Sequence, residues 1–308
     1  MSVSSVGALA GASAVHEVPE REPDLVSAGG SRTWSLRGRN FAVAITRLAV
    51  GDRLAERDVP DEYVLLVPED AVVDVARGGR AYTTVAGPAL VVVPAGTSVV
   101  RATAAATVVR VFSARCPEQT GRAVNRDRPA DPRTAPLPGP AAAGRAGNGT
   151  GSGVGRVRVH RLADVPEEEG RLGRIFRTGS LMVNWFPVRE GPRDPEALSP
   201  HAHADFEQMS VTLAGDHVHH LRVPWTPRMS EWRDDEHVRV GSPSMTLIPP
   251  TVVHTTRAVG AGPHTLIDVF APPRADFLAA GWVLNAADYD DHAASPDRGH
   301  DGRAEVRA

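Results

Sequence analysis

The chain has 308 residues, of which 42% are hydrophobic and 23% are charged, and its formal net charge is -3. This length suffices for two ordinary domains, and the composition is that of a folded protein. The small net charge gives no support for binding to nucleic acid or to an anionic membrane. With Cys116 as its single cysteine, the chain has no internal disulfide and no thiolate metal cluster.

Residues 1–30 are small and polar and follow no periodic pattern, so we expect a disordered arm. The segment has neither the basic start nor the sustained apolar core of a signal peptide. No run approaches the ~20 apolar residues that are needed to cross a bilayer. We therefore expect a cytoplasmic protein.

Two regions of short β-type runs follow, at residues 31–116 and 157–285. Both are rich in valine and threonine, and glycine, proline or aspartate bounds the runs, which is typical of an all-β sandwich or barrel. Residues 117–156 between them are dominated by proline, alanine and glycine and predict a flexible linker. Residues 286–308 are small and charged, and we expect a disordered tail.

Most of the 12 histidines lie in the second β-rich region, and their spacing there is informative. His201 and His203 are two residues apart, so a strand would place both on one face. Glu207 lies an even number of residues further on and joins them if the strand continues without a bulge. His254 follows a proline-marked turn in "SMTLIPPTVVH", which can deliver one side chain to a fixed point. Nitrogen and oxygen donors of this kind suit Fe(II), Mn, Ni, Co or Zn.

The same residues resemble the two cupin motifs. "HAHADFE" matches H-x-H-(x)3-E, and "PPTVVH" matches P-x-G-x-x-H with Thr251 at the usual glycine, where we expect a slightly different turn. The gap from Glu207 to Gly215 is one residue longer than in the commonest form of the first motif. The resemblance covers residues 157–285 and implies a double-stranded β-helix, or jelly roll, that binds one divalent transition metal. Its implied ligands are His201, His203, Glu207 and His254. The alternative is that these are surface polar residues on a β-sandwich.

The first β-rich region repeats this pattern without histidines. In "ALVVVPAGTSVV" the strand and turn recur, and Val99 stands where the second region has His254. Glu56, Asp58 and Glu62 can be aligned with the other three ligand positions, but we expect them to form a solvated strand edge. The chain therefore resembles a bicupin whose first domain is degenerate and lacks metal ligands. That domain would serve packing, dimerisation (as a homodimer) or pocket closure.

The stretch "DHVHHLRVPW" offers further candidates for the site. One strand parity turns His217 and His219 inward; the other turns His220 and Arg222 inward. The second would provide a proton-transfer group and an anchor for a substrate carboxylate, so we take His220 and Arg222 as candidate catalytic residues.

Other residues near the motifs have weaker assignments. Gln208 and Asp205 are candidates to orient an imidazole, although strand parity turns Gln208 away from Glu207. Four aromatic residues flank the motif-bearing strands and would line a pocket mouth or fill the core: Trp185, Phe186, Trp225 and Trp232.

Three classes of function remain open. Four protein ligands on a six-coordinate metal leave two positions for substrate, water or dioxygen. We favour an Fe(II) dioxygenase acting on a small organic substrate, which would bear a carboxylate if Arg222 faces inward. The alternatives are a non-redox metalloenzyme, such as an isomerase, epimerase, lyase or decarboxylase, and a non-catalytic small-molecule-binding or regulatory cupin.

Overall fold

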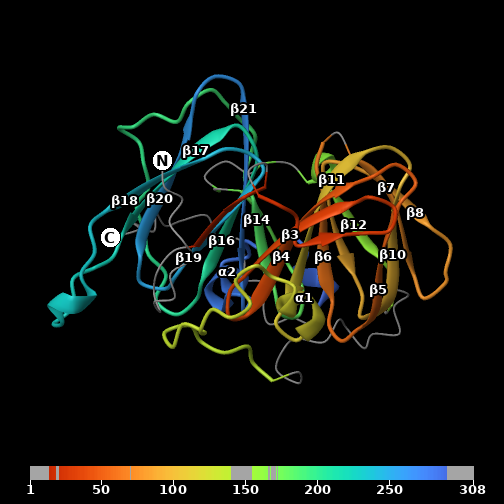
Figure 1. Cartoon of the computed structure of the whole chain (residues 1–308), viewed down its shortest axis with the longest axis horizontal. Coiled ribbons are helices and arrows are strands. Elements are labelled where there is room, and N and C mark those ends of the chain that lie inside the picture. Colours follow the sequence, from red (N-terminus) through yellow and green to blue (C-terminus); the bar gives the residue numbers. More distant parts are fainter. Residues whose placement is uncertain are drawn as a thin grey trace.

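A computed structural model of the chain describes residues 14–18, 21–69, 71–139, 155–165, 167, 171 and 173–289. These residues form two all-β units, which we call the first and the second barrel, side by side in Figure 1. The predicted all-β jelly-roll class is confirmed. The described residues contain no helix that is long and apolar enough to cross a membrane.

The first barrel consists of a large and a small antiparallel sheet. The large sheet contains β2 (Leu25–Val26), β3 (Arg32–Arg37), β4 (Phe41–Leu48), β6 (Tyr63–Val67), β9 (Ala89–Val93), β11 (Ala106–Ser113) and β12 (Arg158–Arg161). The small sheet contains β5 (Arg53–Val59), β7 (Val72–Arg77), β8 (Thr83–Ala86) and β10 (Gly96–Ala102). Short helix α1 (Pro117–Gly121) follows β11.

The second barrel has the same construction. Its large sheet contains β1 (Ala14–Glu17), β13 (Arg174–Arg177), β14 (Met182–Trp185), β15 (Arg189–Glu190), β16 (Gln208–Ala214), β19 (Ser244–Ile248) and β21 (Pro263–Phe270). Its small sheet contains β17 (Asp216–Arg222), β18 (Glu236–Val240) and β20 (Val253–Val259). The short helical segments are η2 (Leu162–Asp164), η3 (Met229–Glu231), α2 (Ala275–Ala279) and η4 (Ala286–Asp288).

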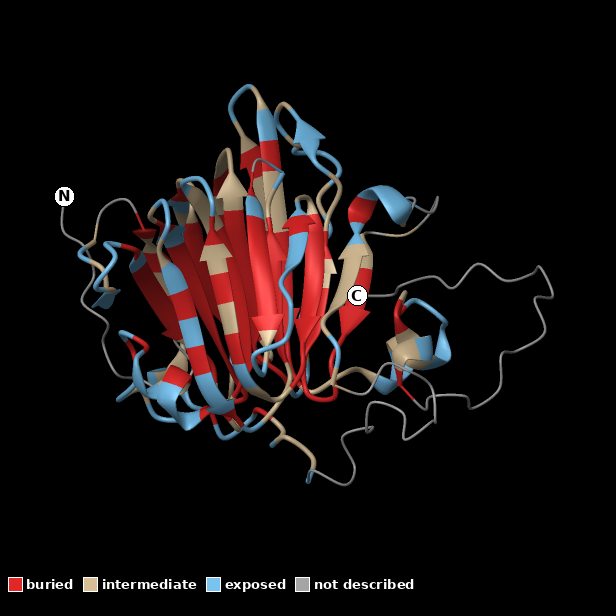
Figure 2. Cartoon of the chain, turned by 90° about the vertical axis from the view of Figure 1, so that its right-hand side faces the viewer, coloured by how far each residue is buried: buried red, intermediate tan, exposed pale blue. Residues whose placement is uncertain are grey.

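The two large sheets pack face to face and enclose the main apolar core. On β4, Phe41, Val43 and Ile45 point into this core, and Met209 and Val211 reach it from β16. Because successive residues of a strand face opposite sides, the alternate residues of these strands face the barrel interiors. Strands buried on both faces explain why β4 is hydrophobic almost throughout, and Figure 2 shows the burial along the strands.

The interiors of the two barrels differ in chemistry. The first barrel is filled by apolar side chains such as Leu65, Val91 and Val100. On the inward face of β16, the second barrel instead has Gln208, Ser210 and Thr212, all three of which are buried. A polar interior that excludes bulk water is a place where a ligand or metal would find partners.

The barrels also exchange strands. β1 lies before the first barrel in the sequence but pairs with β19 of the second, with Ala14 opposite Leu247. In return, β12 pairs with β9 of the first barrel, and His160 lies opposite Leu90. The disordered arm predicted for residues 1–30 is therefore wrong for β1, because an exposed sheet edge provides backbone partners that a four-residue pattern does not reveal. The prediction is also wrong for residues 21–30, where β2 pairs with β3, whereas residues 1–13 lie outside the described residues.

The predicted linker and tail are partly ordered as well. After α1, the chain runs over the surface as far as residue 139 and buries Asn125, Asp131 and Thr134. It is held by side chains that bond its backbone carbonyls, such as Arg39 Nη1 to Thr134 O at 2.7 Å. At the other end, Tyr289 is buried. Residues 140–154 of the linker and 290–308 of the tail lie outside the described residues.

Candidate metal centre

Two segments that are far apart in the sequence meet at the candidate site. His201 and His254 form an isolated antiparallel bridge, in which each backbone N–H donates to the other's carbonyl, at 3.0 and 2.8 Å. His254 is the second residue of β20, and its inward direction places its side chain next to those of His201 and His203. The two predicted halves of the site are thus brought together by backbone pairing.

The turn before His254 is held on both sides. Thr251 has a φ of 66°, the left-handed conformation that glycine adopts easily and a β-branched residue adopts at a cost of about 1–3 kcal/mol. Its N–H donates to the carbonyl of His203 at 2.6 Å, and its hydroxyl accepts from Arg133 Nη1 at 2.8 Å. The threonine therefore adopts a conformation that glycine favours, and Arg133 gives its side chain a partner.

The three imidazoles lie in one cluster. Each offers a nitrogen, and these atoms all lie within 4.8 Å of one another. The ring of His201 is 5.0 Å from that of His203 and 4.4 Å from that of His254. His201 is exposed and His254 is buried, so the cluster runs from the surface into the barrel. A metal held here would be open to solvent on the side of His201.

The hydrogen bonds of two of these rings leave one nitrogen free. His201 Nδ1–H donates to Ser199 O at 3.0 Å, and His254 Nδ1–H donates to Val252 O at 2.9 Å. In both rings the lone pair is therefore on Nε2. In His254 that atom is buried and has no hydrogen-bond partner. Such second contacts fix the tautomer of a metal-ligating imidazole, and the arrangement fits a metal ion.

The protonation states of His203 and His254 also fit a metal site. Burial lowers the pKa of His203 to about 4 and that of His254 to about 3. Phe206 stacks on the His203 ring with centroids 4.1 Å apart and contributes to this burial. Both imidazoles are therefore neutral at pH 7, which is the form that binds a metal.

The structure does not bring the fourth predicted ligand, Glu207, to the cluster. Its carboxylate accepts a hydrogen bond from the backbone N–H of Arg39 in the first barrel, and burial raises its pKa. A Cβ on Gly38 would lie 2.7 Å from Glu207 Oε2, so the glycine permits this approach. The prediction assumed one continuous strand, but the chain bends at Ala204–Asp205 and β16 begins only at Gln208. The bend changes the parity and turns Glu207 outward.

Gln208, the next residue, points into the barrel interior in place of Glu207. Its Oε1 lies 2.8 Å from His203 Nε2, and its Nε2 donates to Ser210 Oγ at 3.1 Å. Ser210 in turn donates to Asp268 Oδ1 at 2.7 Å, and burial raises the pKa of Asp268 to about 7. The long gap to Gly215 was the sequence signal for this shift, because counting from Gln208 makes the gap one residue shorter.

The predicted catalytic pair faces outward. On β17, His217, His219 and Leu221 are buried, and the residues between them are not. His220 Nδ1 contacts His237 Nδ1 at 2.8 Å on the outer face, and the exposed Arg222 is bound to Asp235. The assignment of His220 and Arg222 to the pocket is therefore wrong. The strand register follows from its pairing with β20, which the sequence alone leaves open.

His217 and His219 instead occupy the barrel interior. His219 Nδ1 lies 2.9 Å from the hydroxyl of Thr256, and its Nε2 is buried without a partner. Burial lowers the pKa of His217 to about 4 and that of His219 to about 3. The neighbouring His254 adds to the effect on His219. The strand parity that turns His217 and His219 inward is therefore the one that the structure has.

The four aromatic residues do not gather at one mouth. Trp185 lies in the core between the sheets. Trp225 and Trp232 stack on each other, with centroids 4.6 Å apart, in the insertion between β17 and β18 that extends from the body at the lower left of Figure 1. Of Trp225, 75% is exposed.

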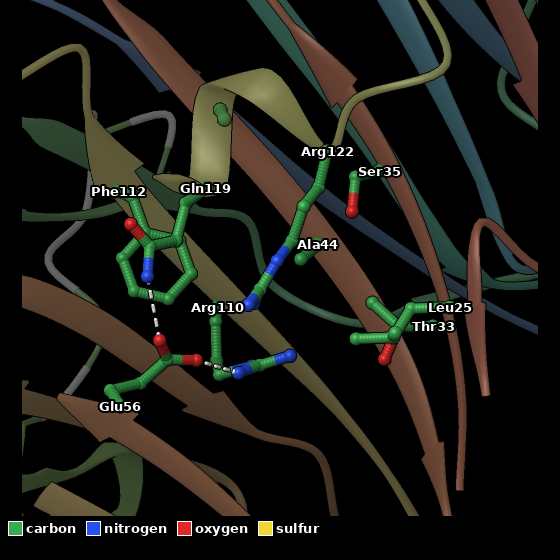
Figure 3. Close-up of a pocket in the computed structure, with 10 residues that line it drawn as sticks. Leu25, Thr33, Ser35, Ala44, Glu56, Arg110, Phe112, Gln119 and Arg122 are labelled. Carbon is green, nitrogen blue, oxygen red and sulfur yellow. Dashed lines mark hydrogen bonds and ion pairs between the residues drawn. The ribbon is translucent and has the colours of Figure 1, made fainter. Parts of the chain in front are cut away.

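The corresponding place in the first barrel is occupied by an ion pair. Glu56 points inward and is bound to Arg110 from β11 and to Gln119 from α1, as Figure 3 shows. Arg110 Nη2 also donates to Thr46 Oγ1 at 3.1 Å. The expected solvated edge is therefore wrong for Glu56. A buried carboxylate that is already paired with a guanidinium is a poor cation ligand.

The comparisons with known proteins agree with this architecture. No protein-family model matches the chain, and neither does any curated protein sequence. Oxalate decarboxylase of Lactobacillus farciminis is similar in structure, with a TM-score of 0.53 and 13% identity over 86% of this chain and 90% of that one. A Bacillus subtilis oxalate decarboxylase gives 0.54 and 12% over 84% and 77%. AerE of Microcystis aeruginosa gives 0.50 and 8% over 79% and 93%.

The fold that these observations define is that of the cupins. With two such barrels in one polypeptide, the chain is a bicupin in fold, as its motifs predict.

Proposed function

We propose that the second barrel holds one divalent transition metal ion and uses it in a reaction on a small organic substrate. His201, His203 and His254 would be the ligands, with the amide oxygen of Gln208 as a fourth donor. The observation that carries this proposal is the convergence of three imidazoles, one of which, His254, presents a buried Nε2 without any partner. Leaving a buried polar atom unpaired costs about 1–3 kcal/mol, which a bound metal would recover.

The donor set bears on the choice of metal. Imidazole suits iron, zinc, nickel and copper, whereas manganese prefers oxygen donors such as carboxylate, carbonyl and water, and three of the four donors here are imidazoles. Because Glu207 is turned away, the cluster offers no carboxylate, and this favours the first group of metals. An Fe(II) dioxygenase is the first candidate within that group.

The charge of the site favours an anionic substrate. Three neutral imidazoles and one neutral amide leave the charge of a divalent ion uncompensated, and such a centre attracts an anion. A substrate carboxylate would supply this negative charge by binding the metal, so that Arg222 is not needed as its anchor. When bound, the metal would polarise a substrate oxygen or, if it is iron, activate dioxygen. The chain's own part is to orient the ligands through Ser199, Val252 and Ser210, and to leave the exposed side of His201 open.

A non-redox metalloenzyme is the second candidate. It is favoured by the similar structures, which include oxalate decarboxylases, one of them described by its Mn(II) centers. For the first barrel we propose a packing role without metal. The apolar core between the sheets and the paired Glu56 and Arg110 support that role.

Metal analysis of protein purified without oxygen, followed by oxygen uptake with a panel of small carboxylates, tests the proposal. Bound iron with substrate-dependent oxygen consumption supports the dioxygenase. Bound zinc, nickel or manganese without oxygen consumption supports the second candidate. A protein that takes up none of these ions at one equivalent contradicts the metal centre itself.

A further inference from the structure

A line of three buried side chains leads away from His203 into the barrel. Gln208 Oε1 faces His203 Nε2 at 2.8 Å, Gln208 Nε2 donates to Ser210 Oγ at 3.1 Å, and the Ser210 hydroxyl donates to Asp268 Oδ1 at 2.7 Å. Gln208 and Ser210 share the inward face of β16, and Asp268 is the partner of Ser210 on β21. The strands themselves therefore hold the three groups in line.

The direction of these hydrogen bonds is determined from the far end. Above its pKa of about 7 the Asp268 carboxylate is ionised and can only accept, and a serine hydroxyl has one hydrogen to give. Because Ser210 gives its hydrogen to Asp268, its oxygen is left to accept one. The side chain of Gln208 must then present its NH2 group to Ser210 and its oxygen to His203. An amide oxygen can bind a metal ion, whereas an amide NH2 group cannot.

We propose that Asp268 is a positioning residue of the metal centre, which through Ser210 keeps the amide oxygen of Gln208 turned toward the metal. This inference rests on the proposed function, because it concerns the fourth donor of that site. It assigns a role to a carboxylate that lies two side chains behind the amide and outside both sequence motifs.

The variant Asp268→Val tests the proposal. Valine fills the space, suits a strand and accepts no hydrogen bond, so the remaining acceptor for Ser210 is the amide oxygen of Gln208. The amide would turn over and present NH2 to the metal. We expect Co(II) affinity, measured by chelator competition at pH 8, to fall by about 10–100-fold, as for other groups that orient a metal ligand. The visible absorption of the bound Co(II) would change as the oxygen donor is lost.

A second change separates this effect from simple damage. Adding Ser210→Ala to Asp268→Val removes the donor that turns the amide, so the double variant should bind Co(II) more tightly than Asp268→Val alone. Thr246→Val is the matched control. Thr246 lies opposite Ser210 on β19 and has a buried, unpartnered hydroxyl, and its loss should leave Co(II) affinity unchanged.

Each outcome has a defined meaning. Parent-like Co(II) affinity in Asp268→Val, or a double variant weaker than the single one, overturns the inference while the metal centre stands. If Asp268→Val does not fold, Ser210→Ala alone is decisive, because an unchanged affinity there also overturns it. A parent protein that binds no Co(II) would mean that the proposed function has failed instead.

Discussion

The carboxylate of Glu207 accepts a hydrogen bond from the backbone N–H of Arg39, in the turn between β3 and β4 of the other barrel. A related contact joins the barrels in the opposite direction. Glu62, the residue aligned with Glu207 from the sequence, accepts from the N–H of Gly179 at 3.4 Å in the turn between β13 and β14. The two matched glutamates therefore connect the barrels, and this explains why the first barrel keeps one although it has no histidine ligands.

Replacing Glu207 should weaken the packing of the barrels and spare the metal. In Glu207→Ala the backbone N–H of Arg39 loses its acceptor, and we expect the free energy of unfolding to fall by about 1–3 kcal/mol. Metal content, measured by mass spectrometry, should stay at that of the parent. Glu207→Gln keeps an acceptor and should lose less stability. By contrast, Gln208→Ala should weaken metal binding about tenfold or more. The reverse pattern would make Glu207 the ligand.

Residues on the outer face of β17 should have no part in the reaction. His220→Ala and Arg222→Ala, separately and together, should leave turnover, metal content and the unfolding midpoint unchanged. The reason is that His220 points away from the barrel interior and contacts His237, and that the Arg222–Asp235 pair lies at the surface, where ion pairs contribute little. A large loss of kcat in Arg222→Ala, with metal content intact, would return this residue to the active site.

Breaking the ion pair inside the first barrel should lower the free energy of unfolding strongly, whereas replacing both of its residues by apolar ones should lower it little. Arg110→Met leaves the buried Glu56 without its cation and should cost about 3–5 kcal/mol in urea unfolding. Adding Glu56→Leu removes the uncompensated charge, and the double variant should recover most of the loss. Equal losses in both variants would contradict this reading.

The buried histidines should make the protein sensitive to acid. Burial lowers the pKa of His219 to about 3, whereas the unfolded value is about 6.5. Between these values the unfolded state binds the extra proton, so stability is full above pH 6.5 and falls as the pH falls. From pH 7 to 5 this one group removes about 2 kcal/mol. With a chelator present, His219→Gln should reduce the loss over that interval by a similar amount. An identical pH dependence in the variant would show that His219 does not titrate as its burial implies.

The sequence predicted the parts of the site that depend on short-range order. Local spacing placed His201 and His203 on one face and His254 after a proline turn. That the three converge was implied by the resemblance to the cupins, and the long-range bridge between His201 and His254 brings them together. Local strand and turn signals predicted two all-β regions, and the resemblance to the cupins implied that each is a barrel. The alignment of Val99 with His254 is wrong, however. Val100 and Ala102 line the interior of the first barrel and Ser98 contacts the buried Tyr63 hydroxyl there, so Val99 faces outward and Ser98 takes the inward position.

The errors arose where long-range pairing decides the result. The bend at Ala204–Asp205 is stabilised from elsewhere, because the carbonyl of Asp205 accepts from Ala135 N–H at 2.7 Å, in a segment predicted to be a linker. The register of β17 follows from its neighbours β18 and β20 and not from its own residues. The order of β1 depends on the free edge of β19, more than two hundred residues away.

The central claim is that His201, His203 and His254 hold a metal ion. The most direct test is the metal content of the double variant His201→Ala/His254→Ala, loaded with Fe(II), Co(II) or Zn(II) and freed of excess metal. The pair on the outer face of the small sheet, His220→Ala/His237→Ala, serves as the matched control. We predict that the parent and the control each retain one equivalent and that the double variant retains none. A double variant that is folded and keeps its metal would contradict the account.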